Sequence, residues 1–324
     1  MKKRNSRWDD EPRLDKSGQP IVVYPCATDI VIFRLLNRYR YLPLDFIQAH
    51  TGLSYSYVKT RLDLLARKPN KFLNRPEKQR AQPNANYRFL IYELAFKGET
   101  VLKDAMLYSK EPRLGDEHMF AHSLMVSETI SSLEMGNTGK MIWWPEIAGR
   151  IVANQQQVAH RSIPVHIEHQ FDNGKKTADF DYYNDSNGPF GIKYPDGTAR
   201  FLSLEAEHTN QVDCSNLTKT SFLKKFLAIK YIMDHKLHTK HWGIPNLITL
   251  VVTSSQARID TMKELIMRET KGKGAAYVAF AIIPVLEDPF KAAKPMPELF
   301  TQGWQRAGYP DLFLNSPTAS KAAA

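Results

Sequence analysis

Apolar residues recur at helical spacing in three consecutive segments between residues 28 and 67. The second segment, residues 44–50, is short and is followed by Gly52, which suits the left-handed position that ends a helix. Ser54 is placed to cap the third helix, over residues 55–67. This order of helix, short helix, tight turn and helix predicts a helix-turn-helix, in which the later helix lies in the major groove of DNA.

The residues after the third helix follow the pattern of a two-stranded wing. Residues 72–73 and 87–94 alternate as strands do, and the polar loop 74–86 separates them. The loop carries three basic residues that would lie at the wing tip and contact the DNA backbone or minor groove, namely Arg75, Lys78 and Arg80. We therefore expect a winged helix over residues 25–112, preceded by a flexible basic arm, residues 1–24.

The rest of the chain alternates between strand and helix patterns. Asn173-Gly174 separates two alternating segments and predicts a β-hairpin. A strand over residues 199–207 precedes a long amphipathic helix and then two apolar strands with another helix between them. Continuous apolar strands favour a sheet covered on both faces, so residues 116–287 are expected to form an α/β domain with a mixed sheet. The expected fold class is therefore α+β or α/β, with an irregular extension over residues 288–324.

Charge is unevenly distributed along the chain, whose formal net charge is +10. Residues 1–110 carry 21 Lys and Arg against 11 Asp and Glu, whereas the remaining residues carry 23 of each. The excess positive charge therefore lies in the N-terminal third. A basic domain joined to a neutral one is typical of a polyanion-binding module attached to a second functional domain. A solvated, soluble face is the alternative that charge alone leaves open.

The third helix carries groups suited to contacting duplex DNA. Those that donate, accept or stack near its N-terminal half are Ser54, Tyr55, Ser56, Tyr57, Lys59, Thr60 and Arg61. Side chains at this end of a recognition helix reach base edges or phosphates. Double-stranded DNA is therefore the expected partner. A helix-turn-helix can also act purely as a protein-docking or dimerisation unit, so a homodimer is an open alternative.

A group of acidic residues in the second domain has the composition of a metal site. Asp196 lies in a turn that leads into a strand, and Glu205 and Glu207 near the strand's end point to the same side. Converging carboxylates would repel each other unless a divalent cation lay among them, which predicts Mg²⁺ bound by Asp196 and Glu205. Such an ion activates water and stabilises a phosphodiester transition state. The alternative is a surface turn followed by solvent-facing acids.

A series of short motifs runs through both domains. They are His122-Ser123-Leu124-Met125-Val126, Trp144-Pro145-Glu146, Pro195-Asp196-Gly197, Glu205-Ala206-Glu207, Lys225 through Lys230-Tyr231, and Val251-Val252-Thr253 followed by Arg258. Their order resembles the replication-relaxation family of plasmids and mobile elements, over residues 29–268. The resemblance implies a role in plasmid or mobile-element DNA replication and relaxation, beside replication or relaxation proteins. It also implies that the second domain is similar to the PD-(D/E)xK nuclease fold of restriction endonucleases.

One position departs from that pattern. An active site of the PD-(D/E)xK fold normally ends its central strand with acid-x-Lys, whereas the third position here is Glu207. Lysine can move to the following helix, which offers Lys219, Lys224, Lys225 and Lys230, with Lys225 or Lys230 suited to the role. The resemblance then implies a catalytic set of Asp196, Glu205, Glu207 and Lys225. Without the lysine, the domain would bind DNA or a partner and would not cut.

Three functions are compatible with these features. The first is a DNA-binding accessory factor that its winged helix targets, and the second is a metal-dependent nuclease or nickase. The third is a transcriptional regulator with a ligand-sensing second domain. No apolar run is long enough to span a bilayer, and no apolar segment follows the basic N-terminus, so a cytoplasmic protein is expected. Whether the chain is an enzyme depends on which of the first two functions holds.

Overall fold

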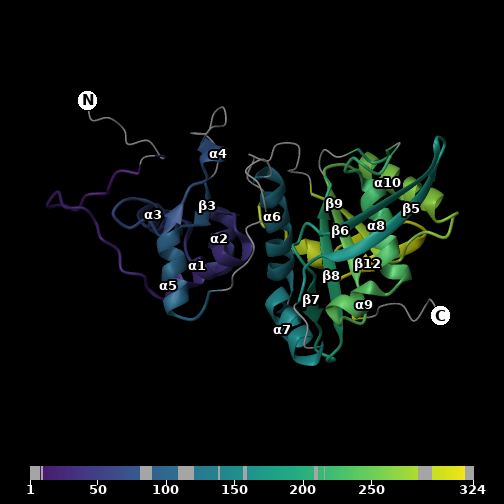
Figure 1. The fold of residues 1–324 in the computed structure, drawn as a ribbon. Helices are drawn as coiled ribbons and strands as arrows, with labels where there is room; N and C mark the ends of the chain where they lie inside the picture. The colour runs from purple at the N-terminus through teal and green to yellow at the C-terminus, as the bar shows by residue number, and fades with distance from the viewer. Residues whose placement is uncertain are drawn as a thin grey trace. The chain divides into compact units, whose positions relative to one another are not determined.

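The computed structural model describes Trp8 and residues 10–80, 90–108, 120–137, 139–155, 159–207, 211–214, 216–283 and 294–317. The fold is mixed, with helices and with sheets of three, seven and two strands (Figure 1). The chain divides into two compact units. Unit 1 comprises Met1–Ser131 and Asp288–Pro295, and unit 2 comprises Ser132–Glu287 and Met296–Ala324. The division falls within helix α6 (Phe120–Gly136), whereas the boundary expected at residues 112–116 lies outside the described residues.

Unit 1 contains the helical order that the sequence predicts. Its helices include α1 (Ala27–Tyr39), α2 (Leu44–Thr51), α3 (Tyr55–Ala66) and α5 (Phe96–Asp104). Gly52 ends α2 with φ 66° and ψ 7°, the left-handed geometry expected of it. Ser54 caps α3, because its hydroxyl accepts a hydrogen bond from the backbone N–H of Tyr57. Local signals therefore fix both ends of the connection between α2 and α3.

A three-stranded antiparallel sheet completes unit 1. Its strands, in spatial order, are β1 (Leu42–Pro43), β3 (Ile91–Leu94) and β2 (Leu73–Asn74). The two strands expected for the wing do pair, with Leu73 opposite Leu94 and Asn74 opposite Glu93. The predicted loop is wrong in one part, because residues Glu77–Arg80 form the short helix α4. Residues 81–89 lie outside the described part of the chain.

Two parts of the predicted flexible arm, residues 10–13 and 21–24, contact the rest of unit 1. The guanidinium of Arg13 forms an ion pair with Asp63 of α3. The backbone N–H of Val23 donates to the side-chain oxygen of Asn70 at 2.8 Å. The polar composition of the segment favoured an arm. Composition does not reveal that Arg13 pairs with Asp63, or that Val23 donates to Asn70.

Unit 2 is built on a seven-stranded mixed sheet in the order β12-β11-β10-β9-β8-β7-β4. The strands are β4 (Lys140–Ile142), β7 (Phe190–Lys193), β8 (Ala199–Ala206), β9 (Ile248–Thr253), β10 (Val278–Ile282), β11 (Gly303–Arg306) and β12 (Tyr309–Phe313). β8, β9 and β10 run parallel, and the outer strands pair antiparallel on both sides. The mixed sheet that the sequence predicts is therefore confirmed.

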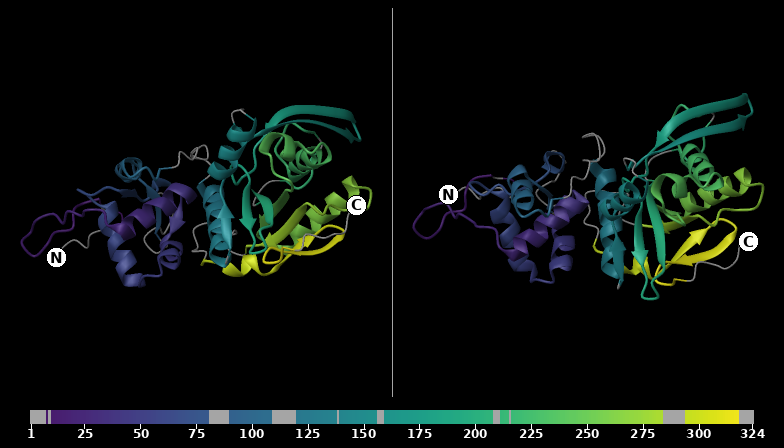
Figure 2. Two further views of the ribbon diagram at one scale, coloured as in Figure 1. Left: turned by 90° about the horizontal axis from the view of Figure 1, so that it is seen from below. Right: turned by 60° about the horizontal axis from the view of Figure 1, so that its bottom comes forward.

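Helices and a hairpin accompany this sheet. The helices are α7 (Trp144–Gln155), α8 (Phe222–Asp234), α9 (Leu237–Trp242) and α10 (Gln256–Glu269). β5 (Ile163–Phe171) and β6 (Gly174–Tyr182) form the predicted hairpin, which packs against α8 and projects beyond the sheet (Figure 2). None of the described helices has both the length and the apolar character needed to cross a membrane.

The C-terminal stretch is not irregular between residues 297 and 313, which corrects the expectation for it. The 3-10 helix η4 (Pro297–Phe300) leads into β11 and β12, and β11 pairs with β10. Trp304 of β11 is fully buried, and its indole N–H donates to the carbonyl of Leu299 at 2.8 Å. Strands this short do not produce a long apolar run, so their pattern was not distinguishable from a loop.

Candidate functional site

The outer side of α3 displays most of the residues predicted to contact DNA. Val58, Leu62 and Leu65 are completely buried, so the opposite side of the helix faces solvent. The exposed residues there and at the cap are Ser54, Tyr55, Ser56, Tyr57, Lys59 and Thr60. The two tyrosines are 52% and 46% exposed in spite of their aromatic rings. Hydroxyl groups, rings and one ammonium group are therefore presented together near the N-terminal end of α3.

Two arginines of the predicted DNA-binding set bind carboxylates within unit 1 instead. Arg61 donates through Nε to Asp29 of α1 at 2.8 Å, and its side chain is 19% exposed. Burial alone would raise the pKa of Asp29, but the hydrogen bond from Arg61 and that from the Cys26 N–H lower it overall. Arg75 lies 2.6 Å from Asp63, and its side chain is 5% exposed. The structure thus places Arg61 and Arg75 in ion pairs that connect parts of unit 1, and Arg75 does not lie at a wing tip.

Asp63 of α3 is the centre of a cluster of arginines. Besides Arg13, it binds Arg67 at 2.9 Å and Arg75 at 2.6 Å. Burial would raise the pKa of Asp63, but Arg67, Arg75 and Arg13 together lower it. A single carboxylate therefore connects α3 to the N-terminal segment and to the residues that follow β2.

The remaining two basic residues predicted for the wing lie in α4. Lys78 is half-buried and lines a cavity in unit 1. The side chain of Arg80 lies outside the described part of the structure. Contact between the wing tip and DNA accordingly stays a prediction.

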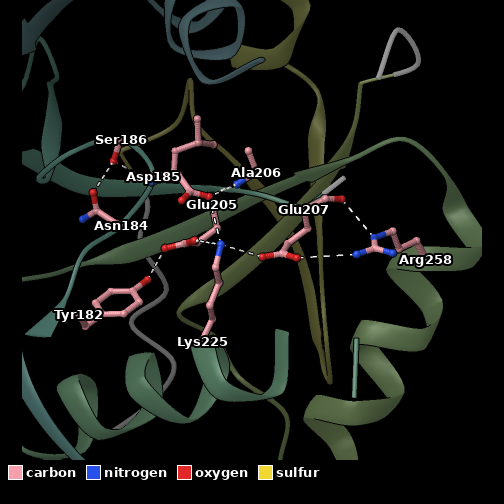
Figure 3. Close-up of polar contacts among 10 residues, drawn as sticks. Tyr182, Asn184, Asp185, Ser186, Glu205, Ala206, Glu207, Lys225 and Arg258 are labelled. Atoms are coloured by element: carbon pink, nitrogen blue, oxygen red, sulfur yellow. Dashed lines mark hydrogen bonds and ion pairs between the residues drawn. The ribbon is translucent and has the colours of Figure 1, made fainter. Parts of the chain in front are cut away.

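In unit 2, the end of β8 and the first turn of α8 meet in a largely buried ionic cluster (Figure 3). The Nζ atom of Lys225 lies 2.6 Å from Glu205, 2.9 Å from Glu207 and 3.1 Å from Asp185. The side chains of Glu205 and Glu207 are completely buried, whereas those of Asp185 and Lys225 are each 14% exposed. The structure thus brings together Glu205, Glu207 and Lys225 of the predicted catalytic set, and adds Asp185, which the sequence analysis missed.

Local structure explains why these groups converge. Glu205 and Glu207 are two residues apart at the end of β8, so their side chains share one face of the sheet. The hydroxyl of Ser221 caps α8 by accepting from the backbone N–H of Lys224, which places Lys225 in the first turn. The helix therefore begins at the point where its lysine reaches the acidic end of the strand.

Asp185 reaches the cluster from the loop after β6. Its carboxylate accepts a hydrogen bond from the backbone N–H of Ala206 at 2.8 Å. The loop is fixed by Asn184, whose side chain accepts from the Gly188 N–H, and by the Ser186 hydroxyl, which accepts from the Leu204 N–H. The loop is therefore hydrogen-bonded to the last residues of β8, beside Glu205 and Glu207.

Two further residues border the cluster. The hydroxyl of Tyr182 at the end of β6 donates to Glu205, and this side chain is buried. Arg258 of α10 has Nη2 3.7 Å from the Glu207 carboxylate, and its Nε donates to the Glu207 carbonyl at 3.1 Å. Besides Lys225, Glu205 therefore accepts a hydrogen bond from Tyr182, and Glu207 has Arg258 as a more distant ion-pair partner (Figure 3).

Burial and charge act in opposite directions in this cluster. Burial raises the pKa of Glu205 and the Asp185 carboxylate raises it further, with Lys225 opposing both in part. Burial alone would lower the pKa of Lys225, but the carboxylates of Glu205, Asp185 and Glu207 raise it overall. Burial also raises the pKa of Tyr182. Lys225 therefore stays protonated and Tyr182 stays a hydrogen-bond donor across the neutral pH range.

Asp196 does not join the cluster, which corrects its predicted roles as a metal ligand and a catalytic residue. It is exposed in the turn before β8, where it accepts from the backbone N–H of Thr198 at 2.9 Å and from its hydroxyl at 2.6 Å. The strand alone, from Ala199 to Glu205, extends roughly 20 Å at about 3.3 Å per residue, and Asp196 lies in the turn before it. The two residues are close in sequence, but the strand between them keeps them apart.

The residues present do not fit the Mg²⁺ site predicted from Asp196 and Glu205. Carboxylate oxygens are suitable ligands for this ion. In the described ranges, however, no three acidic, histidine or cysteine side chains are grouped so that they could hold a metal ion. The ammonium of Lys225 lies among the carboxylates and supplies the positive charge that the sequence analysis assigned to a cation.

Comparison of the chain with protein-family models, with curated proteins and with solved structures found no match. The resemblance to the replication-relaxation family therefore stays a prediction from short motifs. Two features of the molecule bear on function, the outer side of α3 and the acid–lysine cluster of unit 2.

Proposed function

We propose that the protein is a DNA-binding accessory factor in plasmid or mobile-element replication or relaxation. In this proposal unit 1 is a winged helix that binds double-stranded DNA through α3. The observation that carries it is the outer side of α3, where Tyr55, Tyr57 and Lys59 are exposed behind a capped N-terminus. The net charge of +10 on residues 1–110 supports the same partner.

The chemistry of this surface matches what duplex DNA offers. The N-terminal end of a helix carries a partial positive charge, which favours a nearby phosphate. An ammonium such as that of Lys59 neutralises phosphate charge and releases counterions, whereas tyrosine and serine hydroxyls donate to phosphates or base edges. Arg61 does not belong to this contact set, because Asp29 binds it.

Binding of a labelled duplex in a gel-shift assay tests the proposal. The double variant Tyr57→Ala, Lys59→Ala should bind at least about tenfold more weakly, because two exposed contacts are lost without disturbing the core. The matched control is Arg34→Ala, which removes an exposed positive charge from α1. Equal affinity of the double variant and the wild type would contradict the placement of the DNA contact on α3.

For unit 2 we propose a nuclease-like fold that holds a partner or a DNA structure without cutting it. Support comes from the acidic end of β8 and the lysine of the following helix, which lie in the order that the resemblance implies. Complete burial of Glu205 and Glu207 favours a role that does not need access to a substrate.

A second candidate function is cleavage of a phosphodiester bond at this cluster. One observation favours it: the Lys225 ammonium lies within 3.1 Å of the carboxylates of Glu205, Glu207 and Asp185, although Glu207 occupies the usual lysine position. Nicking of supercoiled plasmid, tested with several divalent metals, separates the two functions. Nicking that disappears in Glu205→Gln while DNA binding persists would establish the nuclease, and its absence with every metal would leave the accessory factor.

A further inference from the structure

Unit 1 contains a cavity of about 470 Å³ that the proposed DNA contact does not use. Its volume lies within the usual range for small-molecule sites. Basic side chains that line it are Arg40, Lys71, Arg75 and Lys78, and Tyr41 and Phe120 contribute aromatic walls. Acidic groups also line it, from Asp10, Glu77 and Glu93. Polar groups of both signs and aromatic rings thus converge on one space.

Arg40 is the most unusual residue of the lining. It follows α1 with φ 65° and ψ −59°, a conformation that residues other than glycine rarely adopt. Its Nη1 atom is buried and has no hydrogen-bond partner among the described residues. Its guanidinium lies over the ring of Tyr41, 4.9 Å from the centroid. A buried cationic N–H without a hydrogen-bond acceptor destabilises the fold unless a ligand supplies the acceptor. Backbone strain of this kind is often found at functional sites.

The neighbouring charges leave a positive excess around this space. Asp10 is neutralised by Lys71 at 2.6 Å. Arg75 binds Asp63, which already has Arg13 and Arg67 as further partners, so three arginines share one carboxylate. Four cationic side chains line the cavity against three carboxylates, and two further arginines gather behind it at Asp63, a setting that favours an anion.

We infer that this cavity binds a small organic anion carrying a phosphate or carboxylate group. Arg40 supplies the main anion contact through its buried Nη1, and Lys78 supplies a second positive charge from α4. Tyr41 and Phe120 pack edge to face with ring centroids 4.9 Å apart and give the site a rigid apolar wall. The volume exceeds what a bare phosphate ion fills, so the ligand has an organic body as well as its anionic group.

Isothermal titration calorimetry of the full chain, without DNA, tests the inference. The probes are adenosine monophosphate, citrate and uncharged adenosine, which separate a phosphate from a carboxylate and both from an apolar ligand. We expect at least one anion to bind and adenosine not to bind. Arg40→Gln should weaken that binding about tenfold or more, since a charged hydrogen bond is lost. The control Arg34→Gln, which changes an exposed arginine of the helix that Arg40 follows, should stay within about twofold of wild type.

Folding of each variant is checked by circular dichroism. If Arg40→Gln does not fold, Lys78→Gln takes its place and is expected to weaken binding several-fold. Binding of neither anion, or equal binding by wild type and the folded variant, would overturn the inference. The inference would also be overturned if the folded variant bound duplex DNA more weakly but bound the small anions as wild type does. The cavity residues would then contact the DNA backbone.

Discussion

Replacing Lys225 by methionine removes the ammonium from the ionic cluster of unit 2 and keeps most of the apolar stem. Glu205 and Glu207 are completely buried, so the variant leaves two carboxyl groups without their shared cation. Breaking a buried pair by removing one partner costs about 3–5 kcal/mol. We expect the free energy of unfolding of unit 2 to fall by about this amount at pH 7. The matched control is Lys230→Met, on the same helix, whose ion pair with Asp234 lies at the surface and contributes at most about 1 kcal/mol.

The fall in the free energy of unfolding caused by Lys225→Met should depend on pH, in a direction set by the pKa shifts of the cluster. The pKa of Lys225 is raised in the folded state, so its contribution is fully present below about pH 10 and is lost as pH rises through the folded pKa. Burial and Asp185 raise the pKa of Glu205 in the folded state, and the variant removes the Lys225 charge that opposes this rise. The cost of burying the Glu205 carboxyl therefore sets in above its unfolded pKa of about 4.3 and fades below it. The difference between wild type and variant should therefore shrink in acid.

Urea denaturation followed by tryptophan fluorescence measures this effect. Four of the five tryptophans lie in the sequence ranges of unit 2, namely Trp143, Trp144, Trp242 and Trp304, so the signal reports mainly on that unit. A loss no larger than that of Lys230→Met, or one that grows in acid, would refute the account of the cluster. Adding Glu205→Gln to the Lys225→Met variant should restore part of the stability, because one buried charge is removed.

Three further predictions concern single residues. Arg61→Ala should lower the free energy of unfolding by about 2 kcal/mol, because it leaves the buried Asp29 carboxylate without its main partner. A melting temperature equal to that of wild type would contradict this. Asp63→Asn should make the free energy of unfolding of unit 1 fall less steeply in acid. The lowered pKa of Asp63 gives stability that is present above about pH 4 and is lost as pH falls. A fall in acid as steep as that of wild type would argue against this role of Asp63. Asp196→Ala should leave the free energy of unfolding of unit 2, from urea denaturation, within about 0.5 kcal/mol of wild type, since the residue is exposed in a turn. A loss as large as that of Lys225→Met would place Asp196 back in the cluster.

Local signals in the sequence predicted much of the fold. Gly52 and Ser54 mark the end of one helix and the start of the next because each satisfies backbone groups within a few residues of itself. The same holds for the hairpin turn at Gly174, with φ 112°. The N-terminal segment was misjudged because Arg13 is held by Asp63, which lies 50 residues away in sequence. Long-range pairing of this kind leaves no periodic pattern.

The candidate site of unit 2 shows the same limit. The two-residue period of a strand correctly placed Glu205 and Glu207 on one side, and the position of α8 correctly suggested Lys225. Asp196 was misplaced because nearness in sequence was taken for nearness in space across an extended strand. Asp185 was missed because its loop returns to β8 only in the folded chain. Its place in the loop that follows a predicted strand was the one available signal for it.

The salt dependence of duplex binding shows whether α3 contacts DNA phosphates. Fluorescence anisotropy gives the association constant of wild type and of Lys59→Ala over a range of salt concentrations. If α3 contacts phosphates, the logarithm of the constant falls linearly with the logarithm of salt concentration. Lys59→Ala should then lower the magnitude of the slope by about 0.9, the value for one lost phosphate contact. Absence of duplex binding at low salt, or identical slopes for the two proteins, would contradict DNA binding through α3.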